Sequence, residues 1–430
     1  MKKAIPLFLI LCISTVLLSA CSPPIPTSDQ YVEGYDLQNM FGNAPEFRMC
    51  ASDDSYYYLA PTGTIYIIDK QTLNCVPFCS KPNCKHNNAQ CTARTQSWGI
   101  WMYQDALYVI DPRSQAEIRE DYSNKKHAKD PEKYALETHV LYKISLDGTT
   151  KDAIRKVGVG LSGFIHRGYY YANDFDGVRR YSLTDKEENE LLFKNQANMQ
   201  YSIQSIYGNH IYVLEKSRGY ENNYLLKIEK VKEENEEQTD TKEADPTVIC
   251  SSGYPDSTDE TRVDETYIGS FGEELVMMTI STHTDYSKLY SASVSITDRE
   301  GKNEQVLDYI QSDLDTTMFG SVLIDDQYCY QLYVPPITGS KELWQKSALI
   351  IYDRESEEKA EEIPMFEQYG SPYALYTGDE RYLFLEFEPG TYYENGEYIT
   401  VADTYRTLYI LDKQQIGNGA ELRKLLHLTQ

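Results

Sequence analysis

Asp53-Asp54-Ser55-Tyr56-Tyr57-Tyr58-Leu59 is the first of seven stretches in which a tight polar turn leads into an aromatic or β-branched run. The other six turns and runs are Gln104-Asp105 with Leu107–Ile110, Arg167-Gly168 with Tyr169–Tyr171, Gly208-Asn209 with Ile211–Leu214, Gly272-Glu273 with Leu275–Met278, Asp325-Asp326 with Tyr328–Tyr330, and Gly378-Asp379 with Tyr382–Leu385. Runs of this composition between Gly, Asp and Asn residues are typical of β-strands. A repeat on this scale indicates an array of similar units, which decides the architecture before any local signal does.

Each unit also contains a second short strand that ends on a polar residue. These strands are Tyr66–Asp69, Tyr142–Ser145, Tyr181–Thr184, Leu226–Glu229, Val294–Thr297, Ile350–Asp353 and Tyr409–Asp412. They recur about every 57 residues, and no long segment with helical periodicity competes with them. The pattern therefore predicts an all-β protein.

This spacing favours a β-propeller. One sheet cannot bury both of its faces alone, so neighbouring sheets must stack, and closure into a ring removes the open ends. Propeller units of about 40–50 residues are typical, so the longer spacing indicates insertions, whereas an open solenoid would have shorter and more regular rungs. We expect seven blades, with six or eight if one hairpin is misassigned. Either Glu421–Leu428 supplies the outer strand of the last blade, or Phe47–Cys50 closes the ring.

The N-terminus has the features of an export signal. Lys2 and Lys3 precede an apolar run from Ala4 to Leu18, and Leu18-Ser19-Ala20 precedes Cys21. The Leu-Ser-Ala-Cys ending resembles a bacterial lipobox, and the resemblance implies cleavage before Cys21 and lipidation of its thiol. The alternative is an ordinary signal peptide with an incidental cysteine.

The expected domain organisation follows from this ending. Residues 1–20 form a lipoprotein signal peptide, 21–45 the lipidated Cys21 and a tether, and 46–430 a propeller with a Cys/His-rich insertion at 75–91. The proline-rich segment Ser22–Ser28 is predicted to be a stiff, extended tether. No later stretch approaches the ~20 apolar residues of a spanning helix. We therefore expect a protein anchored to the cell membrane by the lipid on Cys21, on the extracytoplasmic face.

The charge excludes one class of partner. With 41 Lys and Arg against 66 Asp and Glu, the formal charge is −25. Such a surface repels nucleic acid and anionic wall polymers, so we predict no nucleic-acid partner. Two acidic stretches, Glu233–Asp245 and Glu355–Glu362, are predicted to be solvated loops between strands.

A cysteine–histidine cluster follows the first hairpin. Cys79, Cys84, His86 and Cys91 lie within thirteen residues, together with Pro and Asn residues that turn the backbone. Thiolates and imidazole at short spacings suit tetrahedral Zn²⁺, and four protein ligands would make the site structural. The spacing C-x4-C-x-H-x4-C shares only its second half with zinc knuckles. These four residues are the candidate metal ligands, and Zn²⁺ is the only candidate cofactor.

Disulfides are the alternative for the same cysteines, because paired cysteines are usual in exported proteins. Beyond Cys12 and Cys21, seven cysteines remain, namely Cys50, Cys75, Cys79, Cys84, Cys91, Cys250 and Cys329. An odd number leaves at least one free thiol or a metal ligand. Cys329 lies inside a predicted strand and is expected to be a buried apolar residue.

The lipobox, the cluster Cys79-Ser80-Lys81-Pro82-Asn83-Cys84-Lys85-His86 with Cys91-Thr92-Ala93, and the Tyr-rich hairpins together resemble a group of propeller lipoproteins of Gram-positive anaerobic bacteria. The resemblance covers most of the chain and implies the fold and the membrane location. It implies no activity, because the group has none assigned. Cys50 and Cys75 lie outside the group's pattern.

Three functions remain open. The first is a tethered binding or scaffolding module for a protein, peptide or glycan. The second is a hydrolase or lyase with carboxylates that face the channel, which requires polar side chains from several blades to meet at one channel mouth. The third is metal handling or thiol redox chemistry at the cluster. We predict no catalytic residues, because the chain lacks H-E-x-x-H, and Gly160-Leu161-Ser162-Gly163 is one residue short of a nucleophile elbow. An enzyme is therefore the less favoured reading.

Overall fold

The computed structural model describes most of the chain. The described residues are 25–38, 47–126, 137–158, 163–173, 176–196, 199–217, 222–229, 246–253, 258, 260–284, 289–310, 322–334, 340–394, 397–401 and 406–428. The predicted signal peptide, Cys21 and the acidic stretch Glu233–Asp245 lie outside these residues.

The first three sheets each contain four consecutive antiparallel strands. The fourth has the same arrangement, but its outer strand also pairs with the inner strand of the fifth at Gly253 and Glu265, so the two join into one eight-stranded sheet. The strands of the first four sheets are β1 Met49–Ala51, β2 Ser55–Leu59, β3 Ile65–Asp69 and β4 Cys75–Pro77; β5 Trp101–Tyr103, β6 Ala106–Pro112, β7 His139–Ser145 and β8 Lys151–Val157; β9 Gly163–His166, β10 Tyr169–Asn173, β11 Gly177–Ser182 and β12 Asn189–Lys194; β13 Met199–Tyr207, β14 His210–Ser217, β15 Asn222–Glu229 and β16 Thr247–Gly253.

The last three sheets have the same order, and a hairpin, β27–β28, is inserted into the seventh. Their strands are β17 Thr261–Phe271, β18 Glu274–His283, β19 Leu289–Asp298 and β20 Gln305–Val306; β21 Val322–Ile324, β22 Tyr328–Tyr333, β23 Ala348–Asp353 and β24 Lys359–Pro364; β25 Ser371–Tyr376, β26 Tyr382–Glu388, β27 Gly390–Glu394, β28 Glu397–Val401, β29 Thr407–Asp412 and β30 Arg423–His427. The described helices are α2 Gln115–Lys126, α3 Lys341–Trp344, α4 Phe366–Tyr369 and the 3₁₀ turn η3 Lys413–Gln415.

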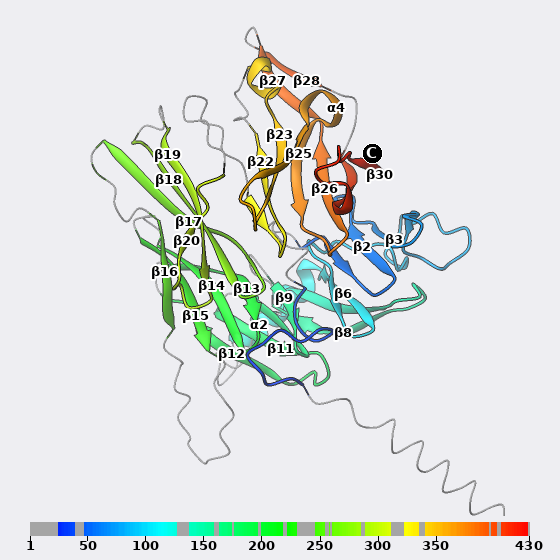
Figure 1. The fold of residues 1–430 in the computed structure, drawn as a ribbon. Helices are drawn as coiled ribbons and strands as arrows, with labels where there is room; N and C mark the ends of the chain where they lie inside the picture. Colours follow the sequence, from blue (N-terminus) through cyan, green and yellow to red (C-terminus); the bar gives the residue numbers. More distant parts are fainter. Residues whose placement is uncertain are drawn as a thin grey trace, which may run out of the picture.

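The seven sheets form a seven-bladed β-propeller, as predicted. Figure 1 shows them arranged around a common centre, with the blue first sheet beside the orange seventh sheet. The first strands of neighbouring sheets contact one another, as β1 with β5 and β5 with β9, so these strands line the channel. Each predicted turn joins the first strand of its sheet to the second, and the two predicted strands are the second and third.

Aromatic and aliphatic side chains fill the spaces between sheets. Trp101 and Tyr170, which belong to neighbouring sheets, are both almost fully buried, and their rings meet edge to face at 6.0 Å. Tyr rings suit this position because each covers a large apolar area. Burial on both faces of every sheet therefore supplies the core of the protein.

The ring closes without a shared strand. β30 forms the outer edge of the seventh sheet, as the first alternative for Glu421–Leu428 predicts, and β1 is the inner strand of the first sheet. Tyr56 packs edge to face on Phe384 at 4.8 Å. Its hydroxyl group donates to Asp379 Oδ2 at 2.5 Å. We call this contact between the first and seventh sheets the seam.

One loop prediction is wrong in part. Residues 359–362 of the acidic stretch Glu355–Glu362 belong to β24, the outer strand of the sixth sheet. An outer strand needs only one hydrogen-bonded neighbour, and only Ile363 of β24 is buried, so charged residues are tolerated there. Cys329 is fully buried in β22, as expected. Among the described residues, none of the helices has the length and apolar character needed to cross a membrane.

The seam should be sensitive to loss of a single hydroxyl group. Burial acts to raise the pKa of the Asp379 carboxyl, but hydrogen bonds from Tyr56 and from the amides of Tyr382 and Arg381 leave it below its usual value of 3.8. Tyr56→Phe should lower the free energy of unfolding by about 1–3 kcal/mol at neutral pH. The stabilisation is present above pH 4 and is lost as the pH falls through the folded pKa, so the difference between variant and wild type should shrink in acid.

Chemical denaturation at pH 7 and pH 3 measures this difference. Tyr57→Phe is the matched control, because Tyr57 is the next residue of β2 and its hydroxyl group interacts with the neutral side chains of Ser52 and Ser55. Equal destabilisation by the two substitutions would contradict the assigned role of the seam.

Candidate functional site

The repeated turns surround one mouth of the channel, because each joins the first and second strands of its sheet. A cavity of about 580 Å³ opens there. Its walls come from the turns of the first, second, sixth and seventh sheets, from Phe271 of the fifth, and from the N-terminal residues Tyr31, Glu33, Gly34 and Gln38. Side chains far apart in the sequence therefore share one site.

The cavity is strongly acidic. Eight carboxylates line it and only two ammonium groups, those of Lys70 and Lys413, accompany them. The carboxylates belong to Glu33, Asp53, Asp54, Asp105, Asp325, Asp326, Asp379 and Glu380.

The two lysines are already engaged with two of these carboxylates. Lys413 Nζ lies 2.6 Å from Asp325 Oδ2 and also donates to the Asp379 carbonyl oxygen at 2.6 Å. Lys70 Nζ lies 3.6 Å from Asp379 Oδ2. The Tyr330 hydroxyl donates to Asp325 Oδ2 at 2.6 Å, and burial together with this carboxylate raises the Tyr330 pKa. Asp325 and Asp379 are thus structural anions that join the sixth, seventh and first sheets.

None of the other six carboxylates forms an ion pair with a described residue. Glu33, Asp53, Asp54, Asp105, Asp326 and Glu380 are exposed to solvent. Like charges around one concave site add their potentials and raise the local concentration of cations. The cavity is therefore suited to a positively charged ligand.

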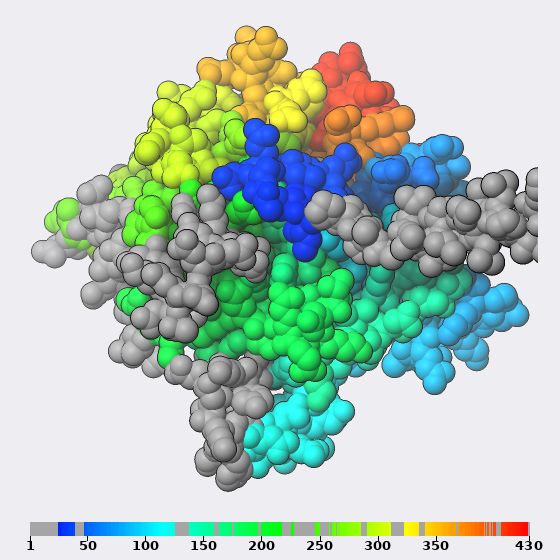
Figure 2. Space-filling model, turned by 90° about the horizontal axis from the view of Figure 1, so that it is seen from below, coloured from blue at the N-terminus to red at the C-terminus, as the bar shows by residue number. Residues whose placement is uncertain are grey.

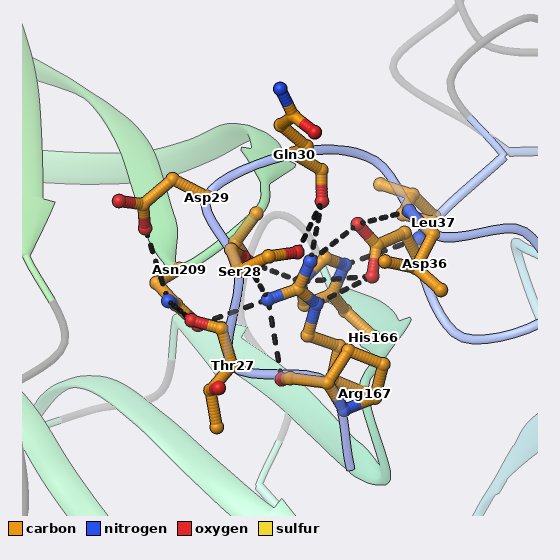
Figure 3. Close-up of polar contacts among 12 residues, drawn as sticks. Thr27, Ser28, Asp29, Gln30, Asp36, Leu37, His166, Arg167 and Asn209 are labelled. Carbon is orange, nitrogen blue, oxygen red and sulfur yellow. Dashed lines mark hydrogen bonds and ion pairs between the residues drawn. The ribbon is translucent and has the colours of Figure 1, made fainter.

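Residues 25–38, which we call the N-terminal strap, lie across the remainder of the mouth. In Figure 2 the strap, in deep blue, lies on the surface of the face between sheets from both halves of the chain. Arg167, in the turn of the third sheet, holds it (Figure 3). The guanidinium donates to Asp36 Oδ1 at 2.5 Å and Oδ2 at 2.9 Å, and to the carbonyl oxygens of Ser28 at 2.6 Å and Gln30 at 2.8 Å.

The fourth sheet also holds the strap. Asn209 Nδ2 donates to the Thr27 carbonyl at 2.6 Å and to Asp29 Oδ1 at 3.0 Å. His166 Nε2 donates to the Gly208 carbonyl at 2.7 Å while Nδ1 accepts from the Leu37 amide at 3.1 Å, which defines a neutral imidazole (Figure 3). The part of the predicted tether that the structure describes is therefore bound to the propeller.

The four candidate metal ligands come together. The ligand atoms of Cys79, Cys84, His86 and Cys91 all lie within 4.8 Å of one another, and His86 Nδ1 is 3.4 Å from Cys91 Sγ. Burial raises the pKa of the Cys91 thiol to about 12. The six cysteines with described side chains, which include Cys50 and Cys75, carry free thiols. The cluster is thus close enough to bind a metal ion.

The cluster lies at the edge between the first two sheets. Cys91 packs with Phe78 and Cys50 in the apolar layer between these sheets. The Thr92 hydroxyl donates to the Gly148 carbonyl of the second sheet at 2.9 Å, and the Ser80 hydroxyl donates to the same oxygen at 3.0 Å. A metal held here would fix the insertion to both sheets.

The arrangement meets one requirement of the hydrolase or lyase alternative, since polar side chains from several sheets meet at one mouth. No histidine or cysteine appears among the described residues of the lining. Sequence reasoning missed the acidic cavity, the two lysines and the strap. The repeated turns were the available signal, because their Asp residues recur at one structural position.

Comparison with solved structures supports the propeller fold. No protein-family model matches the chain, and no curated protein does. It is similar to the solved structure of prolyl oligopeptidase B from Galerina marginata, with 10% identity and a TM-score of 0.51, over 90% of this chain and 52% of that protein. An oligogalacturonate lyase in complex with manganese is similar at 13% identity and a TM-score of 0.37, over 67% of this chain and 71% of that one. The chain thus spans about half the length of prolyl oligopeptidase B, and at this identity the likeness shows the fold alone.

Two glycines test whether the strap is held as described. Gly208 and Gly272 occupy equivalent turn positions with φ of 55° and 52°. A Cβ at Gly208 would lie 2.3 Å from the Asp29 carbonyl oxygen, whereas one at Gly272 meets nothing within 4 Å. Both Ala substitutions should cost about 1 kcal/mol from the left-handed backbone, but only Gly208→Ala should displace the strap.

Amide hydrogen exchange of residues 25–37 measures this displacement. We expect faster exchange in the strap of Gly208→Ala and wild-type exchange in that of Gly272→Ala. The same exchange in both variants would show that the strap is not held on the fourth sheet.

Proposed function

We propose that this protein is a membrane-anchored extracytoplasmic lipoprotein whose propeller binds a positively charged ligand at the acidic channel mouth. The observation that carries the proposal is the set of six carboxylates without ion-pair partners among the described residues around one cavity. Lipidation of Cys21 supplies the anchor, as the lipobox sequence indicates.

The size and chemistry of the cavity support a binding role. Ligand sites usually have volumes of about 300–1,000 Å³, and this cavity lies in that range. Apolar contact is available from Tyr31, Met102 and Phe271 in the same lining. A basic peptide segment combines methylene stems with ammonium groups, so it can use both kinds of surface. Nucleic acid and acidic glycans would be repelled.

A hydrolase or lyase that uses these carboxylates is the second candidate. Its supporting observation is that the side chains of Asp53, Asp105 and Asp326 reach one cavity from three different sheets. Paired carboxylates can act as general acid and base. A catalyst should release product from a substrate in proportion to time, whereas a binding module should reach a fixed occupancy.

Neutralising three carboxylates should weaken binding of a cationic probe. Asp53→Asn, Asp54→Asn and Asp326→Asn combined remove three charges from the mouth without removing a described ion pair. Each exposed charge contributes up to about 1 kcal/mol, so the affinity for an octalysine peptide should fall by up to roughly a hundredfold. Calorimetric titration at low and physiological salt measures the affinity and its salt dependence.

The control variant combines Asp152→Asn, Glu304→Gln and Glu421→Gln, which remove three exposed charges outside the cavity lining. It has the same net charge as the test variant and should bind as the wild type does. Equal weakening in both variants would mean that net charge alone attracts the peptide, and the binding site would be refuted.

We also propose that Cys79, Cys84, His86 and Cys91 hold a structural Zn²⁺. Their ligand atoms need to approach by about 1 Å to reach tetrahedral separations. With four protein ligands no coordination position is left for a substrate. The ion would therefore stabilise the contact between the first and second sheets and take no part in ligand binding.

Metal analysis tests this site. Purified protein should contain about one zinc per chain, and Cys84→Ser combined with His86→Ala should abolish it and lower the melting temperature, because bound metal stabilises the folded state. Cys75→Ser, outside the cluster, should keep the zinc. Alkylation and mass spectrometry that found Cys79, Cys84 and Cys91 in disulfides would refute the metal site.

A further inference from the structure

The N-terminal strap fixes the position of Ile25, the first residue that the structure describes. Ile25 lies against the turn of the third sheet, where a Cβ on Gly168 would be 3.0 Å from Ile25 Cδ1. The turn joins the innermost strand to the second, so Ile25 lies over the inner part of the third sheet. Arg167 and Asn209 hold the carbonyl oxygens of residues 27, 28 and 30, which leaves no slack after Ile25.

The distance from this point to the lipid-bearing residue is short. Only three residues lie between Ile25 and Cys21, so four residue-to-residue steps span at most about 14 Å. The anchor therefore cannot act as a long spacer.

This length disfavours a propeller that stands on its edge. In the third sheet, two further strands lie outside the second strand, and each adds about 4.8 Å. With the side chains of the outermost strand, the outer rim of the propeller lies about 15 Å from the turn. A propeller on its edge would hold Ile25 at least that far above the membrane. The chain between Cys21 and Ile25 is shorter than this height. A propeller with its mouth face toward the membrane does not need a longer chain.

We infer that the acidic mouth faces the membrane, and that its ligand is an extended basic peptide segment lying along the membrane surface. The inference rests on the proposed lipidation of Cys21 and on the proposed binding of cations at the mouth. It adds an orientation and a restriction on shape, since the partner must enter a gap of at most about 14 Å.

The dimensions of partners define this restriction. A folded domain of about 100 residues has a radius of gyration of about 13 Å, so its diameter exceeds the gap. An extended chain needs about 10 Å, as between packed sheets. The uncompensated carboxylates also keep the face off an anionic bilayer, because charges of one sign repel over a Debye length of about 8 Å. The gap thus stays open to a narrow cationic chain.

Energy transfer to the membrane measures the orientation. The full-length lipidated protein is reconstituted in vesicles with a headgroup acceptor, and a fluorescent amino acid is placed at Glu273 or at Thr62. Glu273 lies in a repeated turn on the mouth face, and Thr62 lies in the turn between β2 and β3 on the opposite face. Transfer should be strong from position 273 and weak from position 62. A Gly-Ser spacer of about 20 residues after Ser22, with a mean span of about 25 Å, should remove the difference.

Binding measures the restriction on shape. Soluble protein that begins at Ser22 should bind octalysine and an octalysine fused to a folded domain equally well. Vesicle-bound wild type should still bind free octalysine but should not bind the fused peptide. Insertion of the Gly-Ser spacer should restore binding of the fused peptide.

Each failure has its own signature. Protein that does not attach to vesicles overturns the anchor and the orientation together. Equal transfer from the two positions in attached protein overturns the orientation, whatever binds. Soluble protein that fails to bind octalysine overturns the cation site and the peptide partner, while the transfer result still decides the orientation. Vesicle-bound wild type that binds the fused peptide as tightly as the free one overturns the restriction on shape.

Discussion

The apolar contact between the first and seventh sheets is the constraint on which the ring depends. No strand is shared across the seam, so Tyr56 and Phe384, with the Tyr56 hydroxyl on Asp379, hold the two ends of the chain together. The same Asp379 lines the cavity, and Lys413 links it to Asp325 of the sixth sheet. Closure of the ring and the shape of the mouth therefore share residues. A change that loosens the seam also disturbs one wall of the cavity.

The middle strands of each sheet could be predicted from the sequence, and most of the edge strands could not. The second and third strands are long, aromatic and buried, and a polar turn precedes each pair. Inner strands such as Met49–Ala51 have three residues, too few to show a period. Outer strands such as β24 expose most of their charged side chains and resemble loops. Short inner strands such as β1 are buried but lack length, and outer strands such as β24 lack burial, so neither shows both features that make a strand recognisable.

The cysteine–histidine cluster was predicted because its members lie close together along the chain. The acidic cavity was not predicted, because in a chain with 66 acidic residues the sequence does not show which of them lie close together in the fold. Only the ring geometry shows that Asp53, Asp105 and Asp326 occupy corresponding turns on one face. The strap was harder still, because its binding depends on Arg167, more than 130 residues away in the sequence. Its proline-rich start indicates an extended chain but does not reveal a docking surface.

Each sheet is formed by one uninterrupted stretch of chain, and this has a consequence for engineering. In propellers where a strand from one end of the chain completes the sheet at the other end, both termini must lie in the same sheet. Here no described terminal strand completes a distant sheet, so new termini cut between two sheets would leave the four-stranded ladder of each blade intact. A circular permutant could then carry its lipid anchor on the opposite side of the disc, turning the acidic mouth outward without altering a residue of the cavity.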